Sequence, residues 1–371
     1  MITGICIVLS VIILLFVSMV ISPGAAEKTE VRKNLVSELA QQVYNAKAEA
    51  LGEVSYIRKI YKIPLDQAVA PEPAESCFGE ISDGDSEGLE KFRAEVLNSE
   101  LMDGQDLIFK SGTDVKYYFD DSTAVICWKE VIDGKTCSFC EVKVQDATQL
   151  RRKVFKDNYS LDDVESTRVL AKEANAIAAM SGDYYKFRDY GICVFRNELK
   201  RFTESSFYPD TKSYNFIDTC FIKGNGDLAF FYKGEETDRK SMEQFVSDEN
   251  VMFSLAFGPV LIEDYKFNEN MNRYPIGEPG KNASRAAFGQ YDTLHYLYLN
   301  VSNGTAGKGD TFEQLARHMM DKGVRHAYNL DGGQTAEIVF RDKIYNDIDY
   351  ASERRIGDCI YIATATGGMI K

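Results

Sequence analysis

The sequence predicts an α+β fold with mixed, largely antiparallel sheets and packed helices, preceded by an N-terminal apolar helix and a helical stalk. Three observations support this. Short apolar runs bounded by turn residues follow one another along most of the chain, which is typical of strands in hairpins. Helical patterns are few and irregularly placed, whereas a doubly wound parallel sheet needs strands and helices in alternation. With 371 residues, 44% hydrophobic and 12% aromatic, the chain has ample material for a core.

Residues 1–26 are the membrane-like part of the sequence, either a transmembrane anchor or a signal segment. The uncharged run Ile5–Ile21 is roughly long enough to span a thin bilayer as a helix. Gly24 and Ala26 follow as the small residues that a signal peptidase needs. Basic residues after the run oppose export under the positive-inside rule, although large domains often translocate regardless. We expect a single-pass cell-membrane protein with its C-terminal domain outside, or a protein secreted after cleavage near Ala26.

Residues 27–75 are expected to form a helical stalk and a proline-rich linker. The stalk is charged, with apolar residues at helical spacing. The linker stretch "IPLDQAVAPEPAES" contains three prolines. Residues 76–121 are expected to be a poorly defined extension, with folded structure beginning near Gly104, and residues 122–371 to be the main domain.

The stretch "STAVICWKEVIDGKTCSFCEVKVQD" predicts a hairpin whose two-residue turn is Asp133-Gly134. This turn fixes the register and places Cys127 opposite Cys140 as a non-hydrogen-bonded pair. The two cysteines are therefore either disulfide-bonded or packed side by side as thiols. Cys137 must point to the other face, which argues against a metal site in "CSFC".

Two helices and four further strand-forming stretches complete the predicted domain. Asp162–Ala179 is expected to be a helix that opens in acidic residues. In "TFEQLARHMMDKG", Thr311 and Gln314 suit a capping box, and Gly323 suits the helix end. The other strand candidates are "YGICVFRNEL", "DTCFIKGNGDLAFFY", "VMFSLAFGPVLIEDYKF" and "RAAFGQYDTLHYLYLNV".

The composition argues against two classes of function. The formal charge is −14 and no basic cluster offsets it, whereas nucleic-acid binding requires Lys and Arg to neutralise phosphates. The three histidines lack metal-ligand spacing, which argues against a histidine-based zinc site. We therefore expect no nucleic-acid partner, no metal and no cofactor.

Four polar spots punctuated by glycine interrupt the apolar runs. Each of them alone is most often a turn. They are "SGDYYKFRDYG" with Ser181, Asp183, Arg188 and Asp189, "FGPVLIE" with Gly258-Pro259, "SRAAFGQ" with Arg285, and "YNLDGGQTAEIVF" with Asn329, Asp331, Gly332, Gly333, Gln334, Thr335 and Glu337.

Together with "TFEQLARHMMDKGVRHAYNLDGG" and "SERRIGDCIYIATA", these blocks resemble the phosphodiester glycosidase family over roughly Ser122–Ala365. The resemblance implies an α+β domain with a cleft that hydrolyses a sugar–phosphate diester at the anomeric carbon. The family's first block usually reads Asn-Gly-Gly or Asn-Gly-Asp, and Ser181 replaces that Asn here. Its last block usually reads Asp-Gly-Gly-Gly-Ser, and Gln334 and Thr335 follow the two glycines here. Glu337 adds a carboxylate where a hydroxyl residue is usual.

Cleavage of a glycosyl–phosphate bond builds positive charge on the sugar and negative charge on the phosphate, so it needs carboxylates and guanidiniums. We assign Asp183 and Asp331 as catalytic carboxylates in one cleft, with Arg285 within reach of both. The candidate substrate-binding residues are Arg285, Arg188, Asn329, Gln334, Thr335, and Gly332 with Gly333, whose N–H groups suit an anion nest.

Each assignment has a structural alternative. Asp183 and Asp331 could stabilise turns, and Arg285 could be a structural partner of a carboxylate. Arg188, Asp189 and Glu337 are expected at the surface or behind the reacting groups.

The sequence thus predicts a hydrolase of sugar–phosphate diesters in envelope glycans or their precursors. The alternative is a non-catalytic glycan-binding or exopolysaccharide- or envelope-assembly module that uses the same cleft. The expected partners are a glycan or sugar-phosphate substrate, and the membrane through the N-terminal helix.

Overall fold

The computed structural model describes residues 61–102, 106–159, 163–203, 217–302, 309–348 and 352–367. The expected membrane segment and stalk helix, residues 1–60, lie outside these ranges. Within the ranges, none of the helices has the length and apolar character needed to cross a bilayer.

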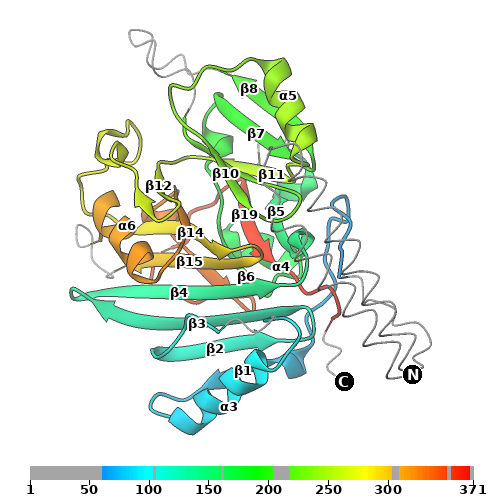
Figure 1. The fold of residues 1–371 in the computed structure, drawn as a ribbon, viewed down its shortest axis with the longest axis vertical. Helices are drawn as coiled ribbons and strands as arrows, with labels where there is room; N and C mark the ends of the chain where they lie inside the picture. Colours follow the sequence, from blue (N-terminus) through cyan, green and yellow to red (C-terminus); the bar gives the residue numbers. More distant parts are fainter. Residues whose placement is uncertain are drawn as a thin grey trace, which may run out of the picture. The chain divides into compact units, whose positions relative to one another are not determined.

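Nineteen strands of the described residues form three sheets in which neighbouring strands run antiparallel (Figure 1). The nine-stranded sheet contains, in spatial order, β1 (Phe78–Ile81), β2 (Thr113–Phe119), β3 (Thr123–Ile132), β4 (Lys135–Val144), β15 (His295–Ser302), β14 (Arg285–Asp292), β16 (His326–Leu330), β12 (Val260–Glu263) and β13 (Lys266–Phe267). One five-stranded sheet contains β10 (Leu228–Phe231), β9 (Thr219–Ile222), β11 (Phe253–Ala256), β7 (Gly191–Phe195) and β8 (Glu198–Thr203). The other contains β18 (Lys343–Ile344), β17 (Ile338–Phe340), β6 (Ala178–Ser181), β19 (Asp358–Ile362) and β5 (Leu150–Val154).

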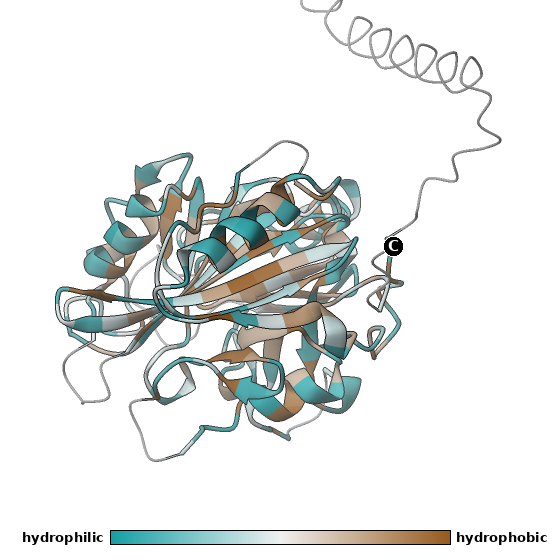
Figure 2. Ribbon diagram, turned by 90° about the horizontal axis from the view of Figure 1, so that it is seen from below, coloured by the Kyte–Doolittle hydropathy of each residue, from teal (hydrophilic) through white to brown (hydrophobic). Residues whose placement is uncertain are grey.

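Four α-helices of the described residues pack on these sheets, and the prediction of an α+β fold with antiparallel sheets is confirmed. They are α3 (Ser86–Leu97), α4 (Thr167–Glu173), α5 (Arg239–Asp248) and α6 (Phe312–Asp321). Helix α6 begins at the predicted capping box of Thr311 and Gln314, and its apolar stripe packs against β12, β14 and β16. Hydrophilic residues gather on the outer faces of the helices, while the strands behind them are largely hydrophobic (Figure 2).

Both faces of the nine-stranded sheet carry buried side chains. One face packs against α3 and α6 through side chains such as Phe92, Trp128 and Phe312. The opposite face packs against the two five-stranded sheets through side chains such as Phe288 and Met180. The three sheets therefore enclose a common core, and loops at strand ends from all three can meet.

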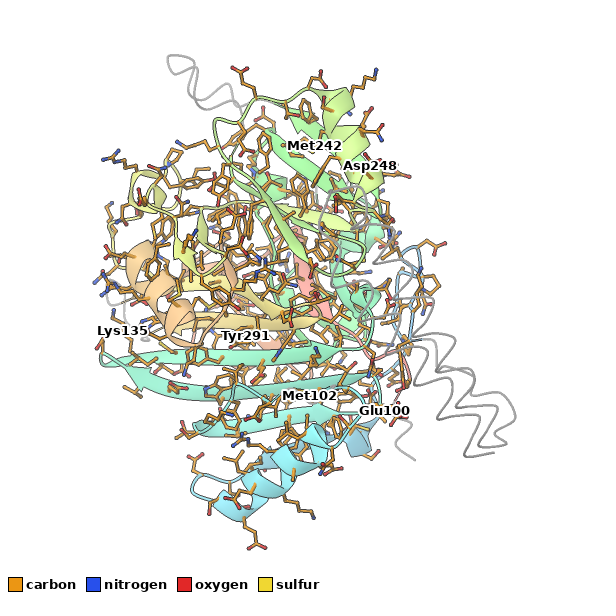
Figure 3. The ribbon with its side chains drawn as sticks, viewed as in Figure 1. Glu100, Met102, Lys135, Met242, Asp248 and Tyr291 are labelled. Atoms are coloured by element: carbon orange, nitrogen blue, oxygen red, sulfur yellow. The ribbon has the colours of Figure 1, made fainter. Side chains whose placement is uncertain are left out.

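The β3–β4 hairpin has the predicted register, from Ile132 opposite Lys135 to Cys127 opposite Cys140. The turn forms because Asp133 and Gly134 take positive φ values of 50° and 73°. Lys135 lies at the end of this long hairpin (Figure 3).

Cys127 and Cys140 are buried free thiols in the core beneath the small sheets. Cys137 packs in the core on the other face of the sheet, as predicted. The side-by-side thiol alternative therefore describes the pair.

The predicted helix Asp162–Ala179 is largely wrong. Helix α4 covers only Thr167–Glu173, and Ala178–Ser181 form strand β6. This strand lies between β17 and β19, and its side chains are buried. Burial within the sheet outweighs the helix propensity of its alanines.

The segment that was expected to be a linker packs on the domain. The N–H of Ile63 donates to Thr148 Oγ1 at 2.9 Å, and Arg151 Nη2 donates to Gln67 O at 2.6 Å. Beyond it, β1, α3 and β2 occupy residues for which little structure was expected, and Phe92 and Val96 of α3 are buried. The folded unit thus begins well before Gly104.

Candidate functional site

The candidate site lies where one strand from each of the three sheets ends. Strand β6 leads into Asp183, β11 into Phe257 and Gly258, and β16 into Asp331. The N–H of Ala256 donates to Asp183 Oδ2 at 2.8 Å, and Asn329 Nδ2 donates to Gly258 O at 2.7 Å. The segments that follow β6, β11 and β16 are therefore neighbours, although they are far apart in sequence.

Asp183 is fully buried and both of its carboxylate oxygens accept hydrogen bonds. Oδ1 accepts from Arg152 Nη2 at 2.9 Å and from the N–H of Tyr185 at 2.8 Å, while Oδ2 accepts from Ala256. These bonds join β5, the loop after β6 and β11. Asp183 therefore holds the three segments together and has little capacity left to react.

Arg152 bridges Asp183 and Asp358 in a buried triad. Its Nε donates to Asp358 Oδ2 at 2.8 Å, and the three side chains are at most 1% exposed. Burial lowers the pKa of Arg152, but the two carboxylates outweigh burial and raise it. A Cβ at Gly182 would lie 2.1 Å from Asp358 Oδ2, so glycine is required beside the triad.

Arg188 is a buried cation with unused donors. Its side chain is 4% exposed, and Nη2 lies 3.7 Å from Asp183 Oδ2, too far for a hydrogen bond. Nε and Nη2 have no hydrogen-bond partner among the described residues. Arg188 also opposes the rise in the pKa of Asp331, so it interacts with both predicted carboxylates. Such a guanidinium suits a bound anion.

Asp331 differs from Asp183 because it is partly exposed and incompletely bonded. Its Oδ2 is buried and has no partner among the described residues. Burial raises its pKa, and the Thr335 hydroxyl, Arg354, the N–H of Gly332 and Arg188 oppose that rise. Asp331 is therefore the better placed of the two carboxylates to reach a substrate.

Several buried polar atoms around this junction have no hydrogen-bond partner within the described parts of the chain. They are Ser181 Oγ, Arg188 Nε and Nη2, Asn329 Oδ1, Asp331 Oδ2 and Asp358 Oδ1. A buried polar group without a partner costs about 1–3 kcal/mol, so a cluster of such groups is typical of a ligand site.

The two glycines after Asp331 fit closely against the residue before β14. A Cβ at Gly332 would lie 2.5 Å from Ser284 O, and Gly333, with φ 64°, donates its N–H to the same oxygen at 2.8 Å. The Gly333 N–H is thus already bonded, which weakens the predicted anion nest. Thr335 Oγ1 donates to Gly332 O at 2.8 Å, and Gln334 Nε2 donates to Ser352 O at 2.9 Å.

Among the described residues, the Arg285 side chain donates hydrogen bonds to backbone carbonyls and not to Asp183 or Asp331. Its guanidinium donates to four backbone carbonyls and stacks 4.4 Å from the centroid of the Phe312 ring. The acceptors are Asp310 O, Gly277 O, Glu278 O and Lys281 O. Alternation along β14 explains this orientation: Ala286 faces the small sheets, whereas Ala287, on the same side as Arg285, faces α6. The geometry favours a structural role, and burial lowers the pKa of Arg285 to about 10.

Three residues of the site were not predicted from the sequence: Arg152, Asp358 and Arg354. A signal for Arg152 exists, because alternation places it on the same strand face as Leu150 and Val154. An arginine on an apolar face indicates a buried partner. Asp358 and Arg354 lie within the recognised closing block, but nothing in their own spacing indicates a role.

Glu337 is fully buried, so it does not lie at the surface, which was one of its two expected locations. Neither of its carboxylate oxygens has a hydrogen-bond partner among the described residues. Burial and the nearby Glu353 raise its pKa to about 8, against the opposing effects of Arg168 and Thr167. The raised pKa favours the protonated, uncharged form of this carboxyl near neutral pH.

Comparison with known proteins supplies the family. A search of the curated proteins found no match. Among solved structures, the catalytic domain of zebrafish N-acetylglucosamine-1-phosphodiester alpha-N-acetylglucosaminidase, auto-inhibited by its pro-peptide, is similar with a TM-score of 0.50 and 15% identity, over 84% of this chain and 99% of that chain. This likeness shows a shared fold. A hypothetical protein from Synechocystis aligns with a TM-score of 0.47 and 11% identity, over 67% of this chain and 63% of that chain.

The family profile described as phosphodiester glycosidase matches residues 174–363, about half of the chain. The match contains the loops that carry Asp183, Arg188 and Asp331. The chain therefore belongs to the phosphodiester glycosidase family.

Proposed function

We propose that the protein hydrolyses sugar–phosphate diesters in envelope glycans or their precursors. The observation that carries the proposal is Arg188, a buried guanidinium whose Nε and Nη2 have no hydrogen-bond partner among the described residues. It lies 3.7 Å from Asp183 and within electrostatic reach of Asp331. A phosphodiester group would supply the negatively charged acceptor oxygens for these donors. Membership of the family supports the same reaction class.

In this proposal Arg188 neutralises the phosphate while Asp331 faces the anomeric carbon. The bond between that carbon and the phosphate oxygen breaks, and its electron pair stays on the oxygen. Water supplies the hydroxyl group of the sugar, and Asp331, the carboxylate with a free oxygen, accepts the water proton. A phosphate monoester leaves readily, so a strong general acid is not needed.

Asp183 has a positioning role in this scheme. Its oxygens are already bonded, and its charge lies 3.7 Å from Arg188 Nη2. It holds the Arg188 guanidinium in place without contacting the substrate.

The test is release of free sugar from an α-linked sugar–phosphate ester by the full chain. We expect Asp331→Asn to abolish release while the melting temperature stays the same or rises, because the variant removes a partly desolvated charge. Asp183→Asn should lower the melting temperature, because its amide group would face N–H donors. Asp189→Asn, an exposed neighbour, is the matched control and should change neither property.

Activity that survives in both Asp183→Asn and Asp331→Asn would exclude this mechanism. The second candidate is a non-catalytic glycan-binding module. It is favoured by the saturation of Asp183, which leaves one reactive carboxylate rather than two. Binding of a sugar phosphate without turnover of any diester would select that candidate.

We further propose that the domain acts outside the cell, anchored by the apolar run Ile5–Ile21. The sequence of that run supports this location. Protease accessibility of the domain on intact cells would test it.

A further inference from the structure

Three side chains, from the loop after β6 and the segment before β19, form a stack. The Tyr184 and Phe187 rings lie 4.5 Å apart between centroids, with 27° between their planes. The Arg354 guanidinium lies 5.3 Å from the Tyr184 centroid and 5.4 Å from the Phe187 centroid. Arg354 Nη2 also donates to the Tyr184 hydroxyl at 3.2 Å, which fixes the cation over the rings. We call these three residues the aromatic stack.

Core packing does not account for the aromatic stack. Phe187 is 43% exposed, and the hydrophobic core clusters of the described residues contain neither ring. Tyr184 has φ 67°, a conformation that is unfavourable for a bulky residue. The preceding residue, Asp183, accepts hydrogen bonds from the N–H groups of Tyr185 and Ala256, and these bonds hold the backbone of Tyr184 in that conformation. The strained backbone of Tyr184 and the exposed ring of Phe187 together indicate a binding surface.

The aromatic stack borders the groups assigned to the reaction. Arg354 opposes the rise in the pKa of Asp331, so the guanidinium lies within electrostatic reach of that carboxylate. Gln334 Nε2 donates to Ser352 O, which ties the loop after Asp331 to the segment that carries Arg354. On the other side, Phe187 directly precedes Arg188 in the chain.

From this arrangement we infer that the aromatic stack is the subsite for the sugar ring of the substrate. The inference rests on the proposed function, in which the anomeric carbon lies at Asp331. The ring that contains this carbon is then the part of the substrate nearest the stack. A pyranose has a face of C–H groups that packs on an aromatic ring, and its hydroxyls can accept hydrogen bonds from Arg354. The class of ligand is therefore a hexopyranosyl phosphate.

The test separates recognition of the sugar from recognition of the phosphate. Calorimetry measures the binding of a hexose 1-phosphate and of inorganic phosphate to the full chain. We expect Phe187→Ala to weaken hexose 1-phosphate about tenfold, equivalent to about 1.4 kcal/mol, and to leave inorganic phosphate unchanged. Because Phe187 is exposed, the variant should fold. Phe267→Ala is the matched control, since Phe267 is 42% exposed on the β12–β13 hairpin.

Equal losses for both probes, or no loss for hexose 1-phosphate, would overturn the inference. Tyr184→Phe provides a second variant that keeps the ring but releases Arg354, and we expect it to weaken hexose 1-phosphate by a smaller factor. Failure of the proposed function has a different signature. If the wild-type chain hydrolyses no diester but binds hexose 1-phosphate through Phe187, the reaction is wrong and the subsite stands.

Discussion

Glu337 should make the stability of the domain depend on pH. In the folded protein its pKa is raised from 4.5 to about 8 by burial and by Glu353. The folded state therefore retains a proton that the unfolded state releases above pH 4.5. The associated stability is fully present below pH 4.5 and is lost as the pH rises to about 8. Glu337→Gln keeps the size of the side chain and removes the titration.

The size of the effect follows from the two pKa values. One pKa unit is worth about 1.4 kcal/mol, so the interval from 4.5 to about 8 corresponds to at most about 5 kcal/mol. Arg168, whose side chain is 41% exposed, can turn from Glu353 toward an ionised Glu337 and reduce this penalty. We expect the Gln variant to gain about 2–4 kcal/mol relative to wild type between pH 5 and pH 8.5.

Urea unfolding of both proteins at several pH values measures this gain. Other buried acids, such as Asp218 with its pKa raised to about 6, give slopes of the same sign, but they are common to both proteins and cancel in the difference. The exposed variant Glu236→Gln is the control and should follow the wild type. Parallel pH profiles for wild type and Glu337→Gln would refute the reasoning.

Three further predictions concern other parts of the structure. Arg152→Met should lower the free energy of unfolding by about 3–5 kcal/mol, because it leaves two buried carboxylates uncompensated; an unchanged urea midpoint would contradict this. Arg285→Lys should lower the melting temperature and leave KM for the diester unchanged, because the lysine replaces bonds to backbone carbonyls; a raised KM with unchanged melting would restore a substrate-binding role. Cys127 and Cys140 should both be alkylated in denaturant without prior reduction, and a linked peptide pair in mass spectrometry would show a disulfide instead.

Local geometry explains which parts of the fold could be predicted. The register of the β3–β4 hairpin follows from a two-residue turn, so Asp133-Gly134 determined every pair out to Cys127 and Cys140. Helix α6 carries its start signal in its own sequence. Strand β6 could not be predicted in this way, because its alanines favour a helix and only burial between β17 and β19 makes them a strand.

The candidate site also contains residues that local sequence predicts and residues that only the fold brings together. Asp331 and Arg188 lie in short blocks whose residue order identifies the family. The triad of Asp183, Arg152 and Asp358 could not be predicted from these blocks, because the three residues are distant in sequence and meet only in the folded sheet. Arg285 was assigned from its residue type, whereas the alternation along β14 decides its direction.

The position of β19 bears on how the protein is made. In its sheet β19 lies between β6 and β5, and it follows all other described strands in chain order. During synthesis, β5 and β6 therefore leave the ribosome long before β19, the strand that lies between them and pairs with both. Until then Arg152 lacks Asp358, and two strand edges remain open to pairing with other nascent chains. Activity should consequently appear only after the C-terminal strand has been synthesised, and chaperones that shield open strand edges should matter more for its yield than for that of a hairpin-by-hairpin fold.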